Sequence, residues 1–317
     1  MFKTITGPAL GGTAALVLAA VLLGTAGVAA ALWDRVQITT PLTITLLRIG
    51  FAIPFLFLMT RRDPHRPTAS PARPWRLIGA LGAAFAGSQS LFFLAIPLAG
   101  VTLVVIISLC STVLFVALLS IPLFHERLNG RGQLAVALAG TGTVALTLAG
   151  QDGPALAGTP NYLWGLLAAL GSGVGLAAFM LLAKVTAQRS DMPRSRLLAW
   201  VFAVALALLV PPAAMSGGVQ FDLAPAAWGL ALYMGVVPTG LAYWLLQVGL
   251  QSASATVASV VTLLEPAVAG LLAWLLLGES MTALQLGGAA LMLGSVLLLA
   301  WPAADPPLVP VGDAGDR

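Results

Sequence analysis

Charged side chains are scarce in this sequence. Only 8% of the 317 residues are Asp, Glu, Lys or Arg, whereas 59% are hydrophobic. A soluble domain carries about 25% charged residues, so the composition excludes an ordinary soluble protein. The net charge of +4 does not indicate a nucleic-acid partner, because the basic residues fall in short loops between apolar segments. We therefore expect a membrane protein that contacts lipid and binds no nucleic acid.

Residues that carry catalytic or metal chemistry are scarce too. Cys110 is the only cysteine, so no intrachain disulfide can form. His125 has no second histidine four residues further on, so the helical zinc motif is absent. The chain has no P-loop and no aspartate within an apolar segment, which argues against an ATPase, an intramembrane aspartyl protease or a Mg²⁺-dependent prenyl transferase. An intramembrane serine nucleophile stays open, although no basic partner is evident. We predict a protein that is not an enzyme and that holds no metal or cofactor.

Long apolar segments make up most of the chain. About 20 apolar residues cross the hydrocarbon core of a bilayer as a helix. Ten such segments occur, at about 8–31, 41–60, 77–96, 102–122, 133–150, 162–183, 197–215, 226–248, 254–277 and 282–301. The longest linker runs from Arg61 to Arg76, and we expect residues 302–317 to form a disordered cytoplasmic tail. The predicted fold class is an all-α integral membrane protein with ten transmembrane helices.

The basic residues predict the orientation of these helices. With the N-terminus in the cytoplasm, thirteen of the 15 Lys and Arg residues fall on the inner side: Lys3, Arg61, Arg62, Arg66, Arg73, Arg76, Arg127, Arg131, Lys184, Arg189, Arg194, Arg196 and Arg317. Arg35 falls outside, and Arg48 lies within a span. The positive-inside rule then predicts a multi-pass protein of the plasma membrane with both termini in the cytoplasm.

The two halves of the sequence resemble each other. A shift of 153 residues places Glu126 on Glu279 and Gly87 on Gly240. Five spans per half is an odd number, so the halves must enter the membrane from opposite sides. This pattern predicts two inverted five-helix repeats, residues 1–151 and 152–301, with a binding site near the midplane between them.

Glu265 and Pro266 stand within an apolar segment that runs from Val257 to Glu279. An ionisable group deep in a bilayer costs several kcal/mol unless it is paired, protonated or facing a polar cavity. Pro266 crowds the carbonyl of Thr262 and cannot donate a backbone hydrogen bond, so we expect a kink there. Thr262 and Glu265 share a face with small residues, which predicts a face turned into the helix bundle. The dipeptide is either a structural polar contact at a kink or a substrate or ion site at a broken helix.

Arg48 is the second ionisable residue placed deep in a span, roughly 12 Å from the outer end of its helix at 1.5 Å per residue. Three roles are open to it. It could bind a substrate carboxylate, form a buried pair with Glu265, or extend along the bundle and orient backbone carbonyls.

A mixed polar and aromatic face is predicted in the eighth span. Thr239, Tyr243 and Gln247 are helical neighbours, and Trp244 is adjacent to them. Gln89 belongs to a polar patch in the third span, and Trp200 is adjacent to the position that the repeat assigns to Arg48. Rings and amides together suit an amphipathic organic solute, although any single ring could instead be a packing or lipid contact.

The motifs resemble those of the drug/metabolite transporter superfamily, in its ten-helix EamA type. The similar segments are Leu264-Glu-Pro-Ala-Val, Leu275-Leu-Leu-Gly-Glu, Arg48, Ala242-Tyr-Trp-Leu-Leu-Gln and the glycine-rich fifth and tenth spans. The resemblance covers about residues 8–301. It implies a transporter of small metabolites or amino acids that works most often outward. Val113 departs from the pattern, since the first repeat often has a proline at this position, so the fourth span is expected to be less broken than the ninth.

Together, these observations predict a secondary transporter that exports small zwitterionic or amphipathic solutes by alternating access. Import of such solutes, or a role as a membrane scaffold or flippase subunit, are the alternatives. The fifth and tenth spans are expected to be packing surfaces and a possible homodimer surface. The candidate substrate-binding residues are Glu265, Pro266, Arg48, Thr262, Thr239, Tyr243, Trp244, Gln247, Gln89 and Trp200.

Overall fold

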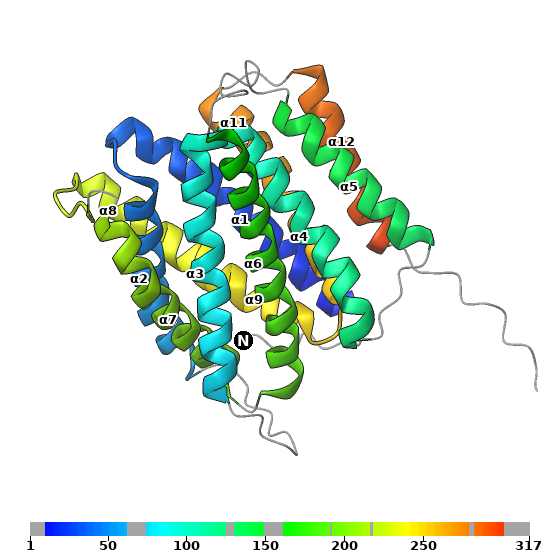
Figure 1. The fold of residues 1–317 in the computed structure, drawn as a ribbon, viewed down its shortest axis with the longest axis horizontal. Coiled ribbons are helices and arrows are strands. Elements are labelled where there is room, and N and C mark those ends of the chain that lie inside the picture. Colours follow the sequence, from blue (N-terminus) through cyan, green and yellow to red (C-terminus); the bar gives the residue numbers. More distant parts are fainter. Residues whose placement is uncertain are drawn as a thin grey trace, which may run out of the picture.

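The structure is a computed structural model that describes residues 10–61, 74–124, 130–148, 161–190, 192–215, 218–278 and 282–300. Within these ranges the regular structure is helical throughout (Figure 1). The elements are α1 (Leu10–Val36), α2 (Pro41–Met59), α3 (Pro74–Ala99), α4 (Val101–Phe124), α5 (Gly130–Leu148), α6 (Tyr162–Arg189), α7 (Arg194–Met215), α8 (Pro225–Met234), η1 (Gly235–Leu241), α9 (Ala242–Leu250), α10 (Ala255–Thr262), α11 (Leu264–Leu277) and α12 (Ala283–Ala300). Eight spans in the described residues are long and apolar enough to cross a membrane. With α5 and α12 they make up the ten predicted spans.

Two of the ten spans are interrupted, and a proline explains each interruption. The eighth span runs as α8, η1 and α9, and η1 is a π-helix that contains Pro238. The ninth span runs as α10 and α11, separated at Leu263, so the kink predicted before Pro266 is confirmed. In contrast, α4 is one continuous helix, as the valine at position 113 led us to expect. The broken helices therefore belong to the second half of the chain.

Two interior contacts repeat at the spacing of 153 residues. A Cβ atom on Gly82 would lie 2.9 Å from the carbonyl oxygen of Val201, and one on Gly235 would lie 2.7 Å from that of Arg48. Gly82 and Gly235 are 153 residues apart, and so are Arg48 and Val201. The same close helix crossing thus occurs once in each half of the structure, as the inverted five-helix repeats require.

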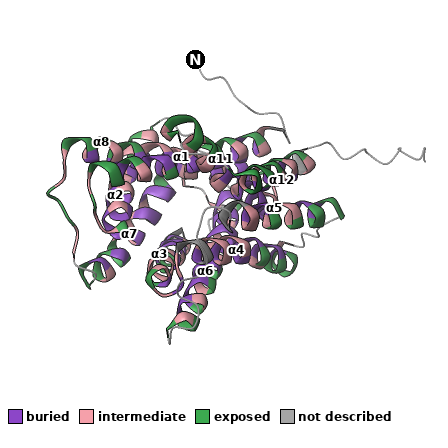
Figure 2. Ribbon diagram, turned by 90° about the horizontal axis from the view of Figure 1, so that it is seen from above, coloured by how far each residue is buried: buried purple, intermediate pink, exposed green. Residues whose placement is uncertain are grey.

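The spans pack into two groups that mix the repeats. One group, here called the α6 bundle, consists of α3, α4, α6 and α7, because α3 and α4 pack along α6 and α7 packs on α3. The other, the α1 bundle, consists of α1, α2, α8, η1, α9, α10 and α11. Helices α5 and α12 lie side by side at the edge (Figures 1 and 2). The two bundles also meet where α2 packs on α7.

The α6 bundle is tied together internally by buried hydroxyl groups. Ser88 of α3 donates to the carbonyl oxygen of Ser172 of α6 at 2.9 Å, and the hydroxyls of Ser108 and Ser172 are 3.0 Å apart. Thr112 donates to the carbonyl oxygen of Gly173 at 3.1 Å. These contacts join α3 and α4 to α6, so the three helices form one connected unit.

Several helices are longer than the sequence predicted, and two of these extensions change the assignment of a residue or a linker. Helix α6 continues to Arg189, so Lys184 is a buried residue of the helix and does not lie in a loop. Helix α3 begins at Pro74, within the predicted linker from Arg61 to Arg76. Residues 62–73 of that linker and the predicted tail at 302–317 lie outside the described residues.

Candidate functional site

Glu265 lies in the first turn of α11, directly after the break at Leu263. The positive end of the helix dipole stabilises a carboxylate at this position. A Cβ atom on Gly24 of α1 would lie 2.8 Å from the carbonyl oxygen of Glu265, so α1 crosses the start of α11 very closely. Pro266 is in the same turn, and Thr262 ends α10 with its hydroxyl bonded to the carbonyl oxygen of Ser259 at 2.8 Å. The break therefore fixes the carboxyl group inside the bundle, about halfway along the span.

Arg48 lies in α2 where α2 crosses the π-helix η1. A Cβ atom on Gly235 would approach the Cβ of Phe51 to 2.5 Å, and one on Gly240 would approach the ring of Phe55 to 2.6 Å. Only glycines at these two positions allow η1 to pack so closely on α2. The Arg48 Nε atom is buried and has no hydrogen-bond partner. The two glycines of η1 thus bring the π-helix directly against the helix that carries the interior arginine.

Arg48 and Glu265 are near each other but do not form an ion pair. Among the described residues, no hydrogen bond or ion pair joins these two side chains. Arg48 and Glu265 nevertheless interact electrostatically with each other and with the phenol of Tyr243. Both charged side chains are partly accessible although they lie mid-span. This arrangement leaves an anionic and a cationic group able to bind the opposite charges of one small solute.

The charges lie on one side of the interior. At the positions related to Glu265 and Arg48 by 153 residues, the chain has Thr112 and Val201. Both charged residues belong to the α1 bundle, and their counterparts belong to the α6 bundle. The wall formed by the α1 bundle is therefore charged, whereas the facing wall has no charge at the equivalent positions. An interior of this kind suits an amphipathic solute.

Tyr243 inserts into an aromatic cluster of the opposite bundle. Its ring centroid lies 5.4 to 5.7 Å from those of Phe85 in α3, Phe179 in α6 and Phe202 in α7. The three phenylalanines are almost fully buried. Such edge-to-face contacts contribute about 0.5–1.5 kcal/mol per pair beyond area burial. Tyr243 thus connects the charged wall of the α1 bundle to the aromatic cluster of the α6 bundle.

Four further predicted site residues are Thr239, Trp244, Gln247 and Gln89. Thr239 and Trp244 flank Tyr243, and the Thr239 hydroxyl and Trp244 Nε1 atom are buried without a partner, so both have hydrogen-bonding capacity left. Gln247 is bonded to the Thr186 hydroxyl at 3.3 Å and lines a small polar pocket near the end of α6. Gln89 is half-buried in α3.

Trp200 lies apart from the other candidates. Its ring packs edge-to-face on Phe57 at 5.7 Å and on Trp75 at 5.4 Å, and both of these rings are exposed on the outside of the bundle. Phe202, two residues further on, belongs to the interior aromatic cluster. The structure therefore places Trp200 and Phe202 on different faces of α7; Trp200 is partly buried, and its Nε1 atom is buried without a hydrogen-bond partner.

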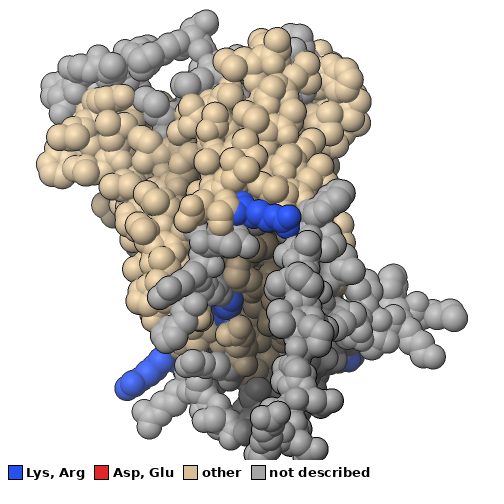
Figure 3. Space-filling model, turned by 90° about the vertical axis from the view of Figure 1, so that its right-hand side faces the viewer, with Lys and Arg blue, Asp and Glu red and all other residues tan. Residues whose placement is uncertain are grey.

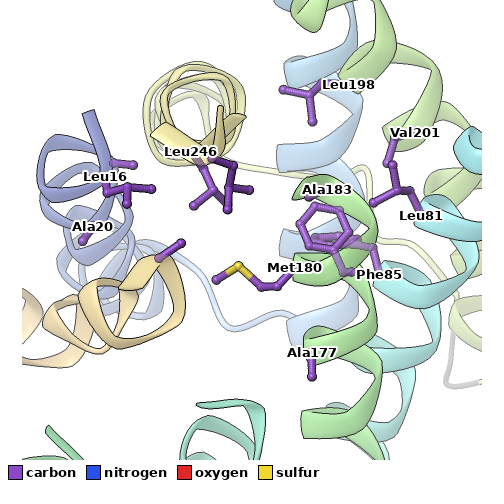
Figure 4. Close-up of a cluster of buried hydrophobic side chains, with 14 of the residues drawn as sticks. Leu16, Ala20, Leu81, Phe85, Ala177, Met180, Ala183, Leu198, Val201 and Leu246 are labelled. Atoms are coloured by element: carbon purple, nitrogen blue, oxygen red, sulfur yellow. The ribbon is translucent and has the colours of Figure 1, made fainter. Parts of the chain in front are cut away.

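The interior is closed between the site and one end of the bundle, which we call the N-terminal end because α1 begins there; the opposite end is the distal end. Met180 of α6 points across the interior toward the side of α1 and α9, where Leu16, Ala20 and Leu246 lie (Figure 4). These residues belong to one continuous buried cluster with Phe85. Apolar side chains from both bundles thus meet on this side of the charged residues.

Polar contacts between the bundles reinforce this closure. The hydroxyls of Ser120 in α4 and Thr256 in α10 are 3.0 Å apart and buried. Lys184 of α6 is 5% exposed, donates to the carbonyl oxygen of Ala253 at 3.2 Å and lies 5.1 Å above the Phe124 ring. Sequence reasoning missed these contacts, because Lys184 was assigned to a loop and the serine and threonine have no distinctive motif.

Comparisons with known proteins agree with this architecture. Residues 163–301 match the model of the EamA-like transporter family. Over 290 residues the chain is 28% identical to an uncharacterized transporter, YwfM, of Bacillus subtilis, covering 90% of this chain and 93% of YwfM. It is 29% identical to an uncharacterized transporter of Archaeoglobus fulgidus, covering 92% and 96%. The second half of the chain therefore resembles the EamA-like transporter family, and both relatives are transporters that match along most of the chain.

A structural comparison adds the fold of most of the chain. One solved crystal structure of a protein superposes with a TM-score of 0.75 and 19% identity, covering 91% of this chain and 96% of that one. Together with the apolar helices, the family match and these relatives indicate a multi-pass membrane protein with a transporter role. The family match lies inside the predicted second repeat, which contains both broken spans, and it leaves the repeat limits 1–151 and 152–301 as predictions.

Proposed function

We propose that this EamA-type protein is a secondary transporter that exports small zwitterionic or amphipathic metabolites, such as amino acids, across the plasma membrane by alternating access. The observation that carries the proposal is the pair of opposite charges, Arg48 and Glu265, held mid-span without pairing to each other. Two unpaired charges in the middle of a membrane span are expensive, so a bilayer protein retains them where a function requires them. A zwitterionic solute would satisfy both charges at once, with its carboxylate at Arg48 and its ammonium at Glu265.

The surrounding residues support an amphipathic solute. Thr239 and Trp244 provide hydrogen-bonding groups that have no partner within the protein. The rings of Tyr243 and Trp244 provide apolar surface beside them. A nucleotide sugar would need several cations for its phosphates, and Arg48 is the one cation that the described residues place at the middle of a span. The proposal therefore favours small solutes with a single carboxylate.

We also propose that the N-terminal end of the bundle faces the cytoplasm. The ten-span topology assigns six described basic residues to this side: Arg61, Arg76, Arg131, Lys184, Arg194 and Arg196. On the face seen in Figure 3, the described residues show basic side chains at mid-height and below, and none of either charge in the upper part. The positive-inside rule then supports cytoplasmic termini. In this orientation the site is closed toward the cytoplasm.

The outer faces of α5 and α12 remain the proposed surface for a homodimer.

Two measurements test the proposed function. The first compares the metabolites in the medium of cells with and without the protein, where an exported solute accumulates outside cells that contain it. The second reconstitutes the protein in liposomes and follows that solute across the membrane. Depletion of the solute from the medium would support import, and liposomes that move no solute would support the scaffold or flippase-subunit alternative.

A further inference from the structure

An apolar groove lies between α2 and α7, on the seam where the two bundles meet. Its volume is about 450 Å³, and the lining residues are Leu46, Leu47, Gly50, Phe51, Pro54, Leu206, Val210, Val219, Phe221 and Trp228. None of them carries a charge, and the one polar atom among their side chains is the indole nitrogen of Trp228. The volume falls within the range of roughly 300–1,000 Å³ that is typical of small-molecule sites.

The groove opens sideways, toward the hydrocarbon of the bilayer. Pro54, Val210 and Phe221 are exposed at its mouth, whereas Leu46 and Leu47 are buried at its floor. Its α2 residues extend over about 12 Å of the helix at 1.5 Å per residue, within the span from Pro41 to Met59. The groove is therefore continuous with the lipid-facing surface of both helices.

The seam is closed near the N-terminal end and open beyond it. Ser195 of α7 is hydrogen-bonded to Thr60 of α2 at 3.3 Å, and Trp200 packs on Phe57 nearby. Toward the distal end, a Cβ atom on Gly50 would meet no atom within 4 Å. The backbone N–H of Gln220, in the segment that covers the distal end of the groove, donates to the Thr43 hydroxyl at 3.4 Å. The groove is thus the part of the seam where α2 and α7 stand apart.

Phe51 connects the groove to the charged site. Its ring packs edge-to-face on Trp228 at 6.2 Å beside the groove, while its Cβ atom lies against Gly235 of η1. Phe51 is also one helical turn from Arg48 on α2. A molecule that fills the groove is therefore expected to affect the position of α2, the helix that carries Arg48.

We propose that an acyl chain of a bilayer lipid binds in this α2–α7 groove and holds the distal part of the seam apart. Only hydrocarbon matches a lining without charges that opens into the bilayer, because a polar group there would lose its hydrogen bonds to water without replacement. This inference is independent of the proposed substrate, since binding of the lipid can be measured without transport.

The test uses the full-length protein in nanodiscs of phosphatidylcholine and phosphatidylglycerol, with and without bromine atoms on the acyl chains. Bromine quenches tryptophan fluorescence on contact, and Trp228 lines the groove. The Trp228 component is obtained by subtracting the signal of Trp228→Phe from that of the unmodified protein. We expect brominated chains to quench this component strongly.

Filling the groove should then protect Trp228. Gly50→Leu places a side chain in the open space, so quenching of the Trp228 component should fall about twofold or more, because quenching needs atomic contact. Gly287→Leu is the matched control, since this exposed glycine of α12 also has no atom within 4 Å of a Cβ position. If Gly50→Leu does not fold, Val210→Phe fills the groove from α7.

Equal quenching in Gly50→Leu and the unmodified protein would overturn the proposal, because the bromine would then reach Trp228 from elsewhere. Relief of quenching by an added aliphatic amino acid would also overturn it, because a transported solute would then be the occupant. Strong quenching that is lost in Gly50→Leu and retained in Gly287→Leu supports the acyl chain.

Discussion

Two residues of this transporter, Glu265 and Arg48, are costly in a bilayer and are not needed for the fold. Glu265 and Arg48 are both expensive in a bilayer, and no hydrogen bond or ion pair between them offsets that cost. The related positions in the other repeat, Thr112 and Val201, show that the fold does not need a charge there. These positions support the proposal that the two charges serve the solute and not the packing.

The first prediction follows from the absence of an ion pair. Glu265→Gln keeps the shape of the side chain and removes its charge, so transport per folded molecule should fall about tenfold or more, equivalent to about 1.4 kcal/mol. Abundance should be retained, because an amide costs less in the membrane than an ion. The measurement is flux into liposomes normalised to folded protein, with Glu265→Asp as the control that keeps the charge.

Arg48→Gln extends the same experiment. Breaking a buried ion pair strands its partner and destabilises a protein by about 3–5 kcal/mol. Since Arg48 and Glu265 are not paired, neither single change should lower the melting temperature in this way, and the double change should not restore it. Recovery of stability in the double variant would show that the two side chains do pair during the transport cycle.

The second prediction compares Trp244 with Trp200, two tryptophans that the sequence predicted equally as substrate-binding residues. Trp244→Ala should change which solutes are moved, because Trp244 flanks the charged site. Trp200→Ala should leave the solute preference unchanged and lower stability, since the loss of its two ring pairs costs about 0.5–1.5 kcal/mol each. Uptake of a solute panel and thermal unfolding distinguish these outcomes. A changed preference in Trp200→Ala would place the cavity on the outer side of α7.

At the scale of elements, the interruptions of the eighth and ninth spans place the site. Pro238 lacks a backbone N–H and therefore interrupts the helical hydrogen-bond pattern, and η1 takes up the change as a π-helix of 7 residues. Short π-helical segments occur frequently at functional sites. Gly235 and Gly240 then bring this segment against α2, next to Arg48.

The third prediction concerns this crossing. A Cβ atom on Gly235 would lie 2.7 Å from the Arg48 carbonyl oxygen, and the backbone cannot move aside without displacing α2. Gly235→Ala should therefore lower both transport and melting temperature. Gly229→Ala in α8 is the matched control, because a Cβ atom there meets nothing within 4 Å. Equal behaviour of the two variants would mean that the crossing tolerates displacement.

Sequence reasoning predicted the elements better than their contacts. Apolar length located all ten spans, and Pro266 located the break in α10–α11, because both depend on local chemistry. The partners of Tyr243 could not be predicted, since three helices distant in sequence contribute Phe85, Phe179 and Phe202. Lys184 was misplaced because a lysine near the end of an apolar segment looks the same whether its helix stops or continues.

At the scale of the whole molecule, the moving units are expected to differ from the repeats. Each bundle combines helices of both repeats, and hydroxyl contacts connect α3 and α4 to α6 within the α6 bundle. Contacts between the bundles include Ser120–Thr256 and Lys184–Ala253, both near the N-terminal end. Alternating access then requires the bundles to separate where these contacts are made.

The last prediction tests this separation with two disulfides in a Cys110→Ala background. The Ser120 and Thr256 hydroxyls are 3.0 Å apart in different bundles, and those of Ser88 and Ser172 are 3.3 Å apart within one bundle. Cysteines at both pairs would bring their sulfur atoms near each other, and a disulfide forms where the Cβ atoms are about 3.5–4.5 Å apart. Oxidised Ser120→Cys/Thr256→Cys should lose about tenfold or more of its transport, or about 1.4 kcal/mol, and reduction should restore it. Oxidised Ser88→Cys/Ser172→Cys should transport normally, because its two helices move together.

Full transport by the first pair while cross-linked would show that the bundles do not separate at this end. Loss of transport in both pairs would mean instead that α3 moves against α6 and that the repeats, not the bundles, are the moving units.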